Sequence, residues 1–225
     1  QRFIDAIQVR CAEKPRTIAF YAEKLARLLE FESLAAAPLD RIDEALIESY
    51  VQERRKQVAP ATVNRQLATL RRLLRLAHEW KVIERVPRIR LLPGDRKREF
   101  VLRHEQEPLY LASAPQPLHD VALLILETGL RVGEALALEW RDVHLEPLNG
   151  ARYGYLLVRQ GKSRNARRIL SLTPRVRKML ERRQGATFSA WVFTNASSSG
   201  PLSIYTLEAQ HARVREALKL DGDFV

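Results

Sequence analysis

An apolar stripe runs from Pro60 to Trp80 without a turn signal, and it is the strongest constraint on how the first half of this chain can fold. Its members recur at the spacing of one helical face: Val63, Leu67, Leu70, Leu74 and Ala77. A helix of this kind draws most of its stability from neighbours that cover that face. Helical segments over residues 15–31 and 43–57, the second opened by Asp43 as an N-cap, predict those neighbours. Residues 1–87 are therefore expected to form a bundle of about four helices.

The character of the sequence changes between Pro87 and Glu99, where two prolines, a glycine and the charged run 95–99 occur together. This composition is typical of an exposed linker. We therefore predict one domain over residues 1–87, a linker over residues 88–99 and a second domain over residues 100–225.

The predicted second domain mixes helical and β-forming segments. Helices are expected over residues 102–114, 119–128, 132–140, 173–183 and 202–218. Residues 153–159 and 168–172 are rich in β-formers and flank a polar loop, which predicts a hairpin. The expected fold class is mainly α with a small β-hairpin or sheet, an N-terminal helical bundle followed by an α+β domain.

The balance of charge points to a polyanionic partner. The chain carries 38 Lys and Arg against 27 Asp and Glu, a formal net charge of +11. Both domains share the excess, with 18 basic and 13 acidic side chains in residues 1–95 and 20 and 14 in the remainder. Such a surplus suits a nucleic acid, because each neutralised phosphate releases counterions. Charge alone fits a ribosomal-type or merely soluble basic protein equally well.

Other classes of protein find little support in the composition. The single cysteine, Cys11, excludes an internal disulfide and is typical of a reducing cytoplasm. No apolar run approaches the roughly 20 residues that cross a bilayer, and no signal peptide is visible. The five histidines show no metal-ligand spacing, and there is no phosphate-binding glycine loop. We expect a cytoplasmic protein without a membrane partner, a metal or a cofactor.

Two stretches concentrate the positive charge. Seven basic residues and no acidic one lie between Arg54 and Arg75, whereas ordinary exposed helices mix both signs. The nucleic-acid contacts predicted there are Thr62, Asn64, Arg65, Arg71, Arg72 and Arg75. Ten basic residues and one acid lie between Arg159 and Arg183, around a hairpin shaped to enter a groove. The contacts predicted on that hairpin are Arg164, Arg167 and Arg168. The alternative for both stretches is a solvated basic face.

The segment Thr128-Gly129-Leu130-Arg131-Val132-Gly133-Glu134 carries the sharpest chemical signal. Gly129 is suited to end one helix, so Arg131 is expected at the mouth of the next. A guanidinium held there can present paired N–H donors to a phosphate. Glu134 follows three residues later on the same helical face and can orient Arg131. The alternative is a structural Arg–Glu pair beside a helix cap.

Continued through Trp140-Arg141-Asp142, this segment resembles the first catalytic box of the tyrosine recombinases, or phage-type integrases. The resemblance implies that Arg131 contacts the scissile phosphate and that Glu134 supports it. Residues 161–168 resemble the hairpin that carries the family's lysine, so Lys162 is implied as general acid toward the leaving 5′-oxygen.

The resemblance extends over nearly the whole chain. Residues 61–83 resemble the last helix of the family's SAM-like core-binding domain, and residues 100–114 resemble its entry into the catalytic domain. It implies a site-specific recombinase or integrase of a bacterial or phage mobile element that acts on double-stranded DNA. The family cleaves and rejoins strands through a 3′-phosphotyrosyl intermediate, without a cofactor, as a homotetramer on two duplexes. Two alternatives stay open: a non-catalytic DNA-binding protein of the same fold, and a type IB topoisomerase-like enzyme.

Two features of the family have no counterpart in this sequence, the His-x-x-Arg box and the nucleophilic tyrosine. His211 is followed by arginines at spacings of two and four, so it is expected to be a surface or packing residue. Tyr205 comes too early to be the nucleophile. The catalytic domain is therefore expected to be incomplete at its C-terminus, and the chain to be a nucleoid-associated fragment that binds DNA but does not cleave it.

Overall fold

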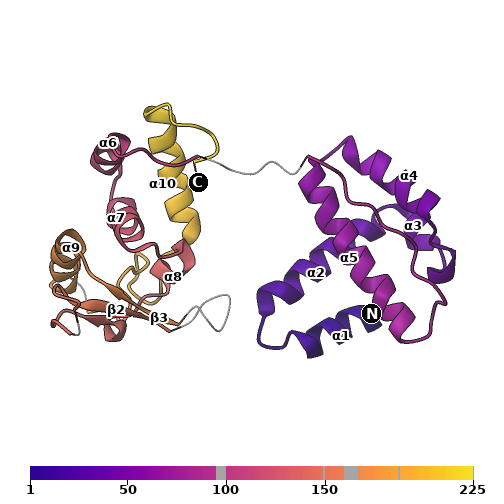
Figure 1. Cartoon of the computed structure of the whole chain (residues 1–225), viewed down its shortest axis with the longest axis horizontal. Helices are drawn as coiled ribbons and strands as arrows, with labels where there is room; N and C mark the ends of the chain where they lie inside the picture. The colour runs from indigo at the N-terminus through magenta and orange to yellow at the C-terminus, as the bar shows by residue number, and fades with distance from the viewer. Residues whose placement is uncertain (95–99, 149, 160–166, 187, 225) are drawn as a thin grey trace. The chain divides into compact units, whose positions relative to one another are not determined.

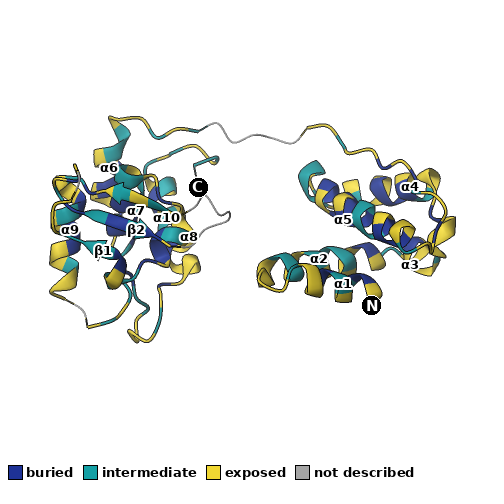
Figure 2. Cartoon of the chain, turned by 60° about the horizontal axis from the view of Figure 1, so that its bottom comes forward, coloured by how far each residue is buried: buried dark blue, intermediate teal, exposed yellow. Residues whose placement is uncertain are grey.

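The computed structural model describes residues 1–94, 100–148, 150–159, 167–186 and 188–224. They form two compact units, Gln1–Lys97 and Arg98–Val225, each with its own buried core (Figures 1 and 2). The predicted fold class is confirmed, because the described residues are mainly helical and contain one small antiparallel sheet.

The described part of the first unit is built from helices and the segments that join them. The helices are α1 (Arg2–Arg10), α2 (Pro15–Leu29), α3 (Glu32–Ala36), the 3-10 helix η1 (Leu39–Arg41), α4 (Glu44–Arg55) and α5 (Pro60–Glu79). Pro15 and Pro60 stand in the first turns of α2 and α5, where a missing N–H costs no intrahelical hydrogen bond. Asp43 caps α4 as predicted, because its carboxylate accepts a hydrogen bond from the Leu46 amide at 2.8 Å.

The apolar face of α5 is the centre of the first unit. Val63, Leu67 and Leu74 have no exposed surface, and Leu70 and Ala77 have almost none. Full burial of such a side chain contributes roughly 1.5–3 kcal/mol. The stripe seen in the sequence is therefore the main source of stability for this unit.

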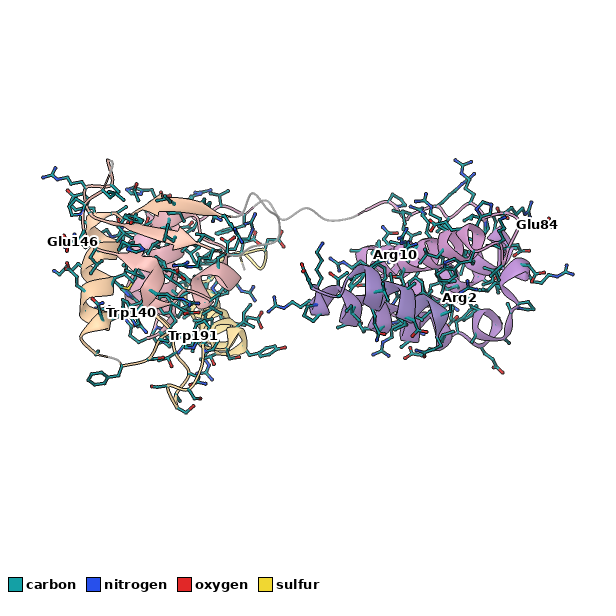
Figure 3. The ribbon with its side chains drawn as sticks, turned by 90° about the horizontal axis from the view of Figure 1, so that it is seen from below. Arg2, Arg10, Glu84, Trp140, Glu146 and Trp191 are labelled. Carbon is teal, nitrogen blue, oxygen red and sulfur yellow. The ribbon has the colours of Figure 1, made fainter. Side chains whose placement is uncertain are left out.

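Two cationic side chains of α1, Arg2 and Arg10 (labelled in Figure 3), contact residues at the end of α5. The Arg2 guanidinium lies over the ring of Trp80, 4.4 Å from its centroid. Arg10 pairs with Glu79 at 3.5 Å, an exposed ion pair of small energetic weight. Both arginines are thus engaged within the unit.

An extended segment that follows α5 packs back onto the bundle. Ile89 is buried, and its carbonyl accepts a hydrogen bond from Arg71. Asn64 donates to the Leu92 carbonyl at 2.9 Å and accepts from the Leu92 amide at 2.8 Å. Residues 88–92 therefore belong to the first unit rather than to the linker predicted over residues 88–99.

The second unit combines helices with a three-stranded antiparallel sheet. Its elements are α6 (Gln106–Ser113), α7 (Leu118–Thr128), α8 (Val132–Leu136), the 3-10 helix η2 (Trp140–Asp142), β1 (Val143–His144), β2 (Tyr155–Val158), β3 (Arg168–Ser171), α9 (Pro174–Gln184) and α10 (Ile204–Ala217). The strand order is β1-β2-β3, and Val158 lies opposite Arg168. The predicted hairpin is confirmed at its base with shorter strands, and residues 160–166 lie outside the described part of the chain.

The helix predicted over residues 132–140 ends at Leu136. The chain beyond it bonds to a distant segment instead of continuing the helix. The Val192 amide donates to the Leu138 carbonyl at 3.0 Å, and the Trp140 amide donates to the Ala190 carbonyl at 2.9 Å. Trp140 and Trp191 consequently lie in the same part of the unit (Figure 3).

A buried acid joins two helices of the second unit. The side chain of Asp120 on α7 is 2 % exposed, and it accepts hydrogen bonds from Arg182 at 2.6 Å and Arg183 at 3.0 Å on α9. Burial disfavours its charged form, but hydrogen bonds from Gln116, His119 and both arginines outweigh that effect and lower the pKa of Asp120. The ionised carboxylate therefore ties α7 to α9.

Candidate phosphate-binding site and nucleic-acid interface

Arg131 lies where α7 gives way to α8. Gly129 ends α7 with a φ of 67°, in the left-handed region that favours glycine, which confirms its predicted place as the helix stop. Leu130 is buried, and it anchors the turn between the two helices. Arg131 follows as the N-cap of α8 with a side chain that is 67 % exposed. The turn thus holds the arginine backbone firmly while its guanidinium faces outward.

Glu134 is the buried acid that binds the arginines of this site. Its side chain is 6 % exposed, and it accepts hydrogen bonds from the Arg131 amide at 3.0 Å and from Arg131 Nη1 at 2.9 Å. It also accepts from Arg168 at the start of β3, through Nη2 at 2.8 Å and Nη1 at 3.3 Å. Hydrogen bonds from Arg168 above all, and from Arg131, lower the pKa of Glu134 to about 2 against the opposing effect of burial. Glu134 is therefore an anion at neutral pH that holds two arginines.

This geometry leaves Arg131 available to a ligand. Among the described residues only Glu134 bonds to its guanidinium, through the single nitrogen Nη1. A guanidinium has five N–H donors in a planar fork that matches two phosphate oxygens. An arginine with a fixed backbone, one anchored nitrogen and an exposed remainder is suited to bind a phosphate.

The second predicted basic surface is only partly described. Lys162 and Arg164 lie outside the described residues. Arg167 is exposed, and its Nε donates to the Arg159 carbonyl at 3.2 Å. Arg168, predicted as a DNA contact, is instead engaged with Glu134, and its side chain is 28 % exposed.

The sequence reasoning missed a second carboxylate–arginine pair next to this hairpin. Asp142 has an 8 % exposed side chain and accepts a hydrogen bond from Arg159, the residue that follows β2. The only signal for it is the stretch Trp140-Arg141-Asp142, which contributes to the family resemblance. That stretch does not indicate the distant partner of Asp142.

The nucleic-acid contacts predicted on α5 divide into two groups by what their side chains contact. Arg65 and Arg75 are exposed, and Thr62 and Arg72 are partly exposed. These four residues lie along one face of the helix. In the described part of the chain, none of the three arginines among them pairs with an acid. We call this set, Thr62, Arg65, Arg72 and Arg75, the α5 face.

Asn64 and Arg71 differ from the α5 face in their role, although both lie on the same side of the helix as Arg75. Asn64 is buried with both polar atoms bonded to Leu92, and Arg71 donates to Ile89. Their hydrogen bonds hold the segment that follows the helix. The structure thus engages them inside the first unit instead of presenting them with the α5 face.

The structure gives His211 internal partners. Its Nδ1 lies 2.8 Å from the Tyr110 hydroxyl, and its Nε2 lies 3.0 Å from the Phe224 carbonyl. Burial raises the pKa of Tyr110 to about 12, so the phenol stays neutral. Tyr205 is 77 % exposed in the first turn of α10. His211 thus has packing contacts, as the sequence predicted.

The described residues contain no group of three or more His, Cys, Asp or Glu side chains that could hold a metal ion. None of the helices in this part of the chain is both long and apolar enough to span a membrane.

Comparison with known protein families matches the two units separately. Residues 1–80 match the phage integrase N-terminal SAM-like domain, and residues 101–225 match the phage integrase family. The second match alone covers more than half of the chain. This chain therefore belongs to the phage integrase family, whose members are tyrosine recombinases.

Curated relatives agree with this assignment. The chain is 28% identical over 146 residues to the integrase of Salmonella phage P22, a match that covers 64% of this chain and 36% of the phage protein. It is 28% identical over 136 residues to the ICEBs1 integrase of Bacillus subtilis, covering 54% of this chain and 36% of that integrase. The matched region thus spans little more than a third of either relative.

Solved structures share the fold. A Tn1549 transposon integrase in complex with a circular intermediate DNA matches with a TM-score of 0.77 at 18% identity, over 96% of this chain and 77% of that one. A lambda integrase tetramer bound to a Holliday junction matches with a TM-score of 0.72 at 21% identity, over 98% of this chain and 66% of that one.

Proposed function

We propose that this chain is the DNA-binding and front catalytic part of a site-specific recombinase that integrates or excises a mobile element. The main support for this proposal is the exposed guanidinium of Arg131, whose Nη1 donates a hydrogen bond to Oε1 of the buried Glu134 at 2.9 Å. This arrangement supplies a fixed cation for a phosphodiester without a metal. The core-binding match over residues 1–80 favours a recombinase over a topoisomerase-like enzyme.

In the proposed reaction, a tyrosine oxygen attacks the scissile phosphorus and forms a 3′-phosphotyrosyl bond. The bond from phosphorus to the 5′-oxygen breaks, and that oxygen leaves with the electron pair and takes a proton from Lys162. Arg131 stabilises the charge that builds on the non-bridging oxygens. Rejoining is the reverse reaction, in which a 5′-hydroxyl attacks the phosphotyrosyl bond. The energy of the broken phosphodiester is kept in that bond until then, so no external energy source is needed.

The α5 face and the Arg131 site lie in different units, and we propose that both bind one double-stranded DNA. The α5 face supplies phosphate contacts that position the first unit, since Arg65, Arg72 and Arg75 are spaced along one helix face. Binding of this kind weakens steeply as salt rises, because it depends on counterion release.

The tyrosine and the His-x-x-Arg box have no counterpart in the sequence of this chain, so we propose that the chain by itself binds DNA without cleaving it. The complete recombinase is proposed to act in the bacterial cytoplasm, on the nucleoid, as a homotetramer that holds two duplexes.

The proposal is tested with the complete gene product and a nicked duplex made from the junctions of the element that carries the gene. The nick lets the short leaving strand diffuse away, so a covalent protein–DNA adduct accumulates. We expect a 3′-linked adduct, and we expect Arg131→Ala to slow its formation by about 10²–10³-fold. Arg27→Ala is the matched control, because Arg27 is an exposed arginine that pairs with Glu30 on the first unit. DNA binding without any adduct would leave the non-catalytic DNA-binding protein as the better description.

A further inference from the structure

The segment that packs back onto the first unit after α5 carries two exposed arginines, Arg88 and Arg90, to which the proposed function assigns no role. We call residues 88–92 the strap. We propose that the strap is part of the DNA-binding surface, and that α5 holds it so that Arg88 and Arg90 bind phosphates of the same duplex as the α5 face. The inference rests on the proposed function, and it assigns DNA contacts to a segment that has the composition of a linker.

The strap is anchored to α5 at two points. Asn64 exchanges a pair of hydrogen bonds with the backbone of Leu92, at 2.9 and 2.8 Å. Two turns further along the helix, Arg71 donates a hydrogen bond to the carbonyl of Ile89. The strap is therefore held by side chains of the same helix that carries the α5 face.

The two anchor points also set the direction and the reach of the strap. They are seven residues apart on α5, which corresponds to about 10 Å of helix, and three residues apart on the strap, which corresponds to about 10 Å of extended chain. The strap thus runs antiparallel to α5, back toward the start of that helix (Figure 1). Arg90 lies between the anchor points. Arg88 lies just beyond them, level with the turn of α5 that contains Arg72 and Arg75.

Burial alternates along the strap, as it does in an extended segment with one side on a core. Pro87 and Ile89 are buried, whereas Arg88 and Arg90 are exposed. The Arg88 amide donates to Glu44 at 2.9 Å, but this bond engages the backbone and not the guanidinium. Within the described ranges, neither guanidinium pairs with an acid. Both cations are therefore available to a ligand.

The α5 face is next to these cations. Arg75 follows Arg71 by four residues, so it lies on the side of the helix that holds the strap. Ala68, which is level with Arg90, is exposed and has a short side chain, so a duplex at the α5 face can approach the strap closely. A surface that only needs to be soluble mixes both signs of charge, whereas the strap and the α5 face present arginines alone. This pattern favours a row of phosphates as the ligand.

The first experiment measures the binding of the 225-residue chain to a fluorescent duplex at several salt concentrations. Arg88→Gln combined with Arg90→Gln should reduce the slope of log affinity against log salt by about two, and should weaken binding by about tenfold or more at about 0.1 M salt. Arg10→Gln combined with Arg27→Gln removes the same charge from two other exposed arginines of the first unit, and should change the slope by less than about 0.5. Equal slopes in the two double variants overturn the inference.

The second experiment tests whether the strap has to be held on α5. Asn64→Ala removes both bonds to Leu92 without a change of charge, so the strap must be ordered when DNA binds. We expect this substitution to weaken binding by about 3–10-fold in the parent chain, and by less than about twofold in the background of Arg88→Gln and Arg90→Gln. Equal losses in the two backgrounds would mean that Asn64 acts by another route, and would overturn the inference.

A further variant guards against a folding defect. Leu92→Pro removes the amide that donates to Asn64, keeps the charge, and should reproduce the pattern of Asn64→Ala. The first experiment depends on neither of these variants, because Arg88 and Arg90 are exposed. A parent chain that does not bind duplex DNA at low salt contradicts the proposed function itself. Salt-dependent binding that the combined Arg88→Gln and Arg90→Gln variant leaves unchanged overturns only the role of the strap.

Discussion

Asn64 and Leu92 form a closed pair, in which the Asn64 amide nitrogen donates to the Leu92 carbonyl at 2.9 Å and the Leu92 amide donates to Asn64 Oδ1 at 2.8 Å. The Asn64 side chain thus makes the same pair of hydrogen bonds to Leu92 that a neighbouring β-strand backbone would make. It holds residues 88–92 on the first unit, close to where the chain leaves that unit.

This pair predicts that Asn64→Ala destabilises the first unit by about 1–3 kcal/mol, because the amide and the carbonyl of Leu92 lose their partners in a partly buried place. Chemical denaturation followed by fluorescence measures the loss, with Trp140 and Trp191 of the second unit replaced by Phe in both proteins so that Trp80 reports alone. Exchange of the Leu92 amide hydrogen should also become faster. Arg65→Ala serves as the comparison on the same helix, and its unfolding free energy should stay within about 0.5 kcal/mol of the parent chain. An unchanged midpoint in Asn64→Ala would show that the pair contributes nothing to stability.

The α5 face predicts a different response to substitution. Arg65→Ala, Arg72→Ala and Arg75→Ala should each weaken duplex binding to a similar degree on every sequence, because phosphate contacts carry no base information. Each should also reduce the slope of log affinity against log salt by about one. Titration of fluorescent duplexes at several salt concentrations gives both quantities. Arg27→Ala should change neither, and a sequence-dependent loss would argue for base contacts instead.

The lowered pKa of Glu134 predicts that the stability of the second unit depends on pH. Its pKa falls from 4.5 to about 2 on folding, so the ionised form stabilises the folded state above pH 4.5, and that contribution is lost as pH falls toward 2. Glu134→Gln should therefore lower the urea midpoint of the second unit at pH 6, and the gap from the parent chain should narrow between pH 4.5 and pH 2. A gap that stays constant with pH would contradict a lowered pKa.

The ion pairs of Asp120 predict that one substitution destabilises the second unit selectively. In Asp120→Asn, Arg183, which is 19 % exposed, loses its charged partner, whereas Arg182, which is 61 % exposed, is solvated by water. We therefore expect a loss of about 1–3 kcal/mol. Hydrogen exchange resolved by peptide should show faster exchange in α7 and α9 and unchanged exchange in α5. Faster exchange in both units would mean that they do not unfold independently.

The sequence predicts those parts of the fold that depend on residues close to one another along the chain. The stripe on α5 repeats within every turn, Asp43 caps the helix that begins one residue later, and Gly129 adopts the left-handed conformation that its type favours. Arg131 and Glu134 lie three residues apart, so their contact was also a local inference.

The parts that sequence could not predict have distant partners. Residues 88–92 have the composition of a linker, and only Asn64, 28 residues from Leu92, shows that they are packed. Arg168 looks like its basic neighbours in the sequence, and its partner Glu134 is 34 residues away. A basic pattern does not distinguish an arginine that meets a phosphate from one that already holds a carboxylate. The helix end at Leu136 has the same origin, because backbone bonds to residues 190 and 192 replace its next turn.

The cluster of Arg131, Glu134 and Arg168 carries one net positive charge, since a single ionised acid faces two guanidinium groups. A phosphodiester in an intact strand carries one negative charge, so the cluster neutralises it with nothing left over. The five-coordinate phosphorus of a strand exchange carries about one charge more, and that surplus must be met by further cations. The three side chains of this cluster therefore match the single charge of the proposed ligand, an uncut phosphodiester, and leave no positive charge to offset the additional charge of strand exchange.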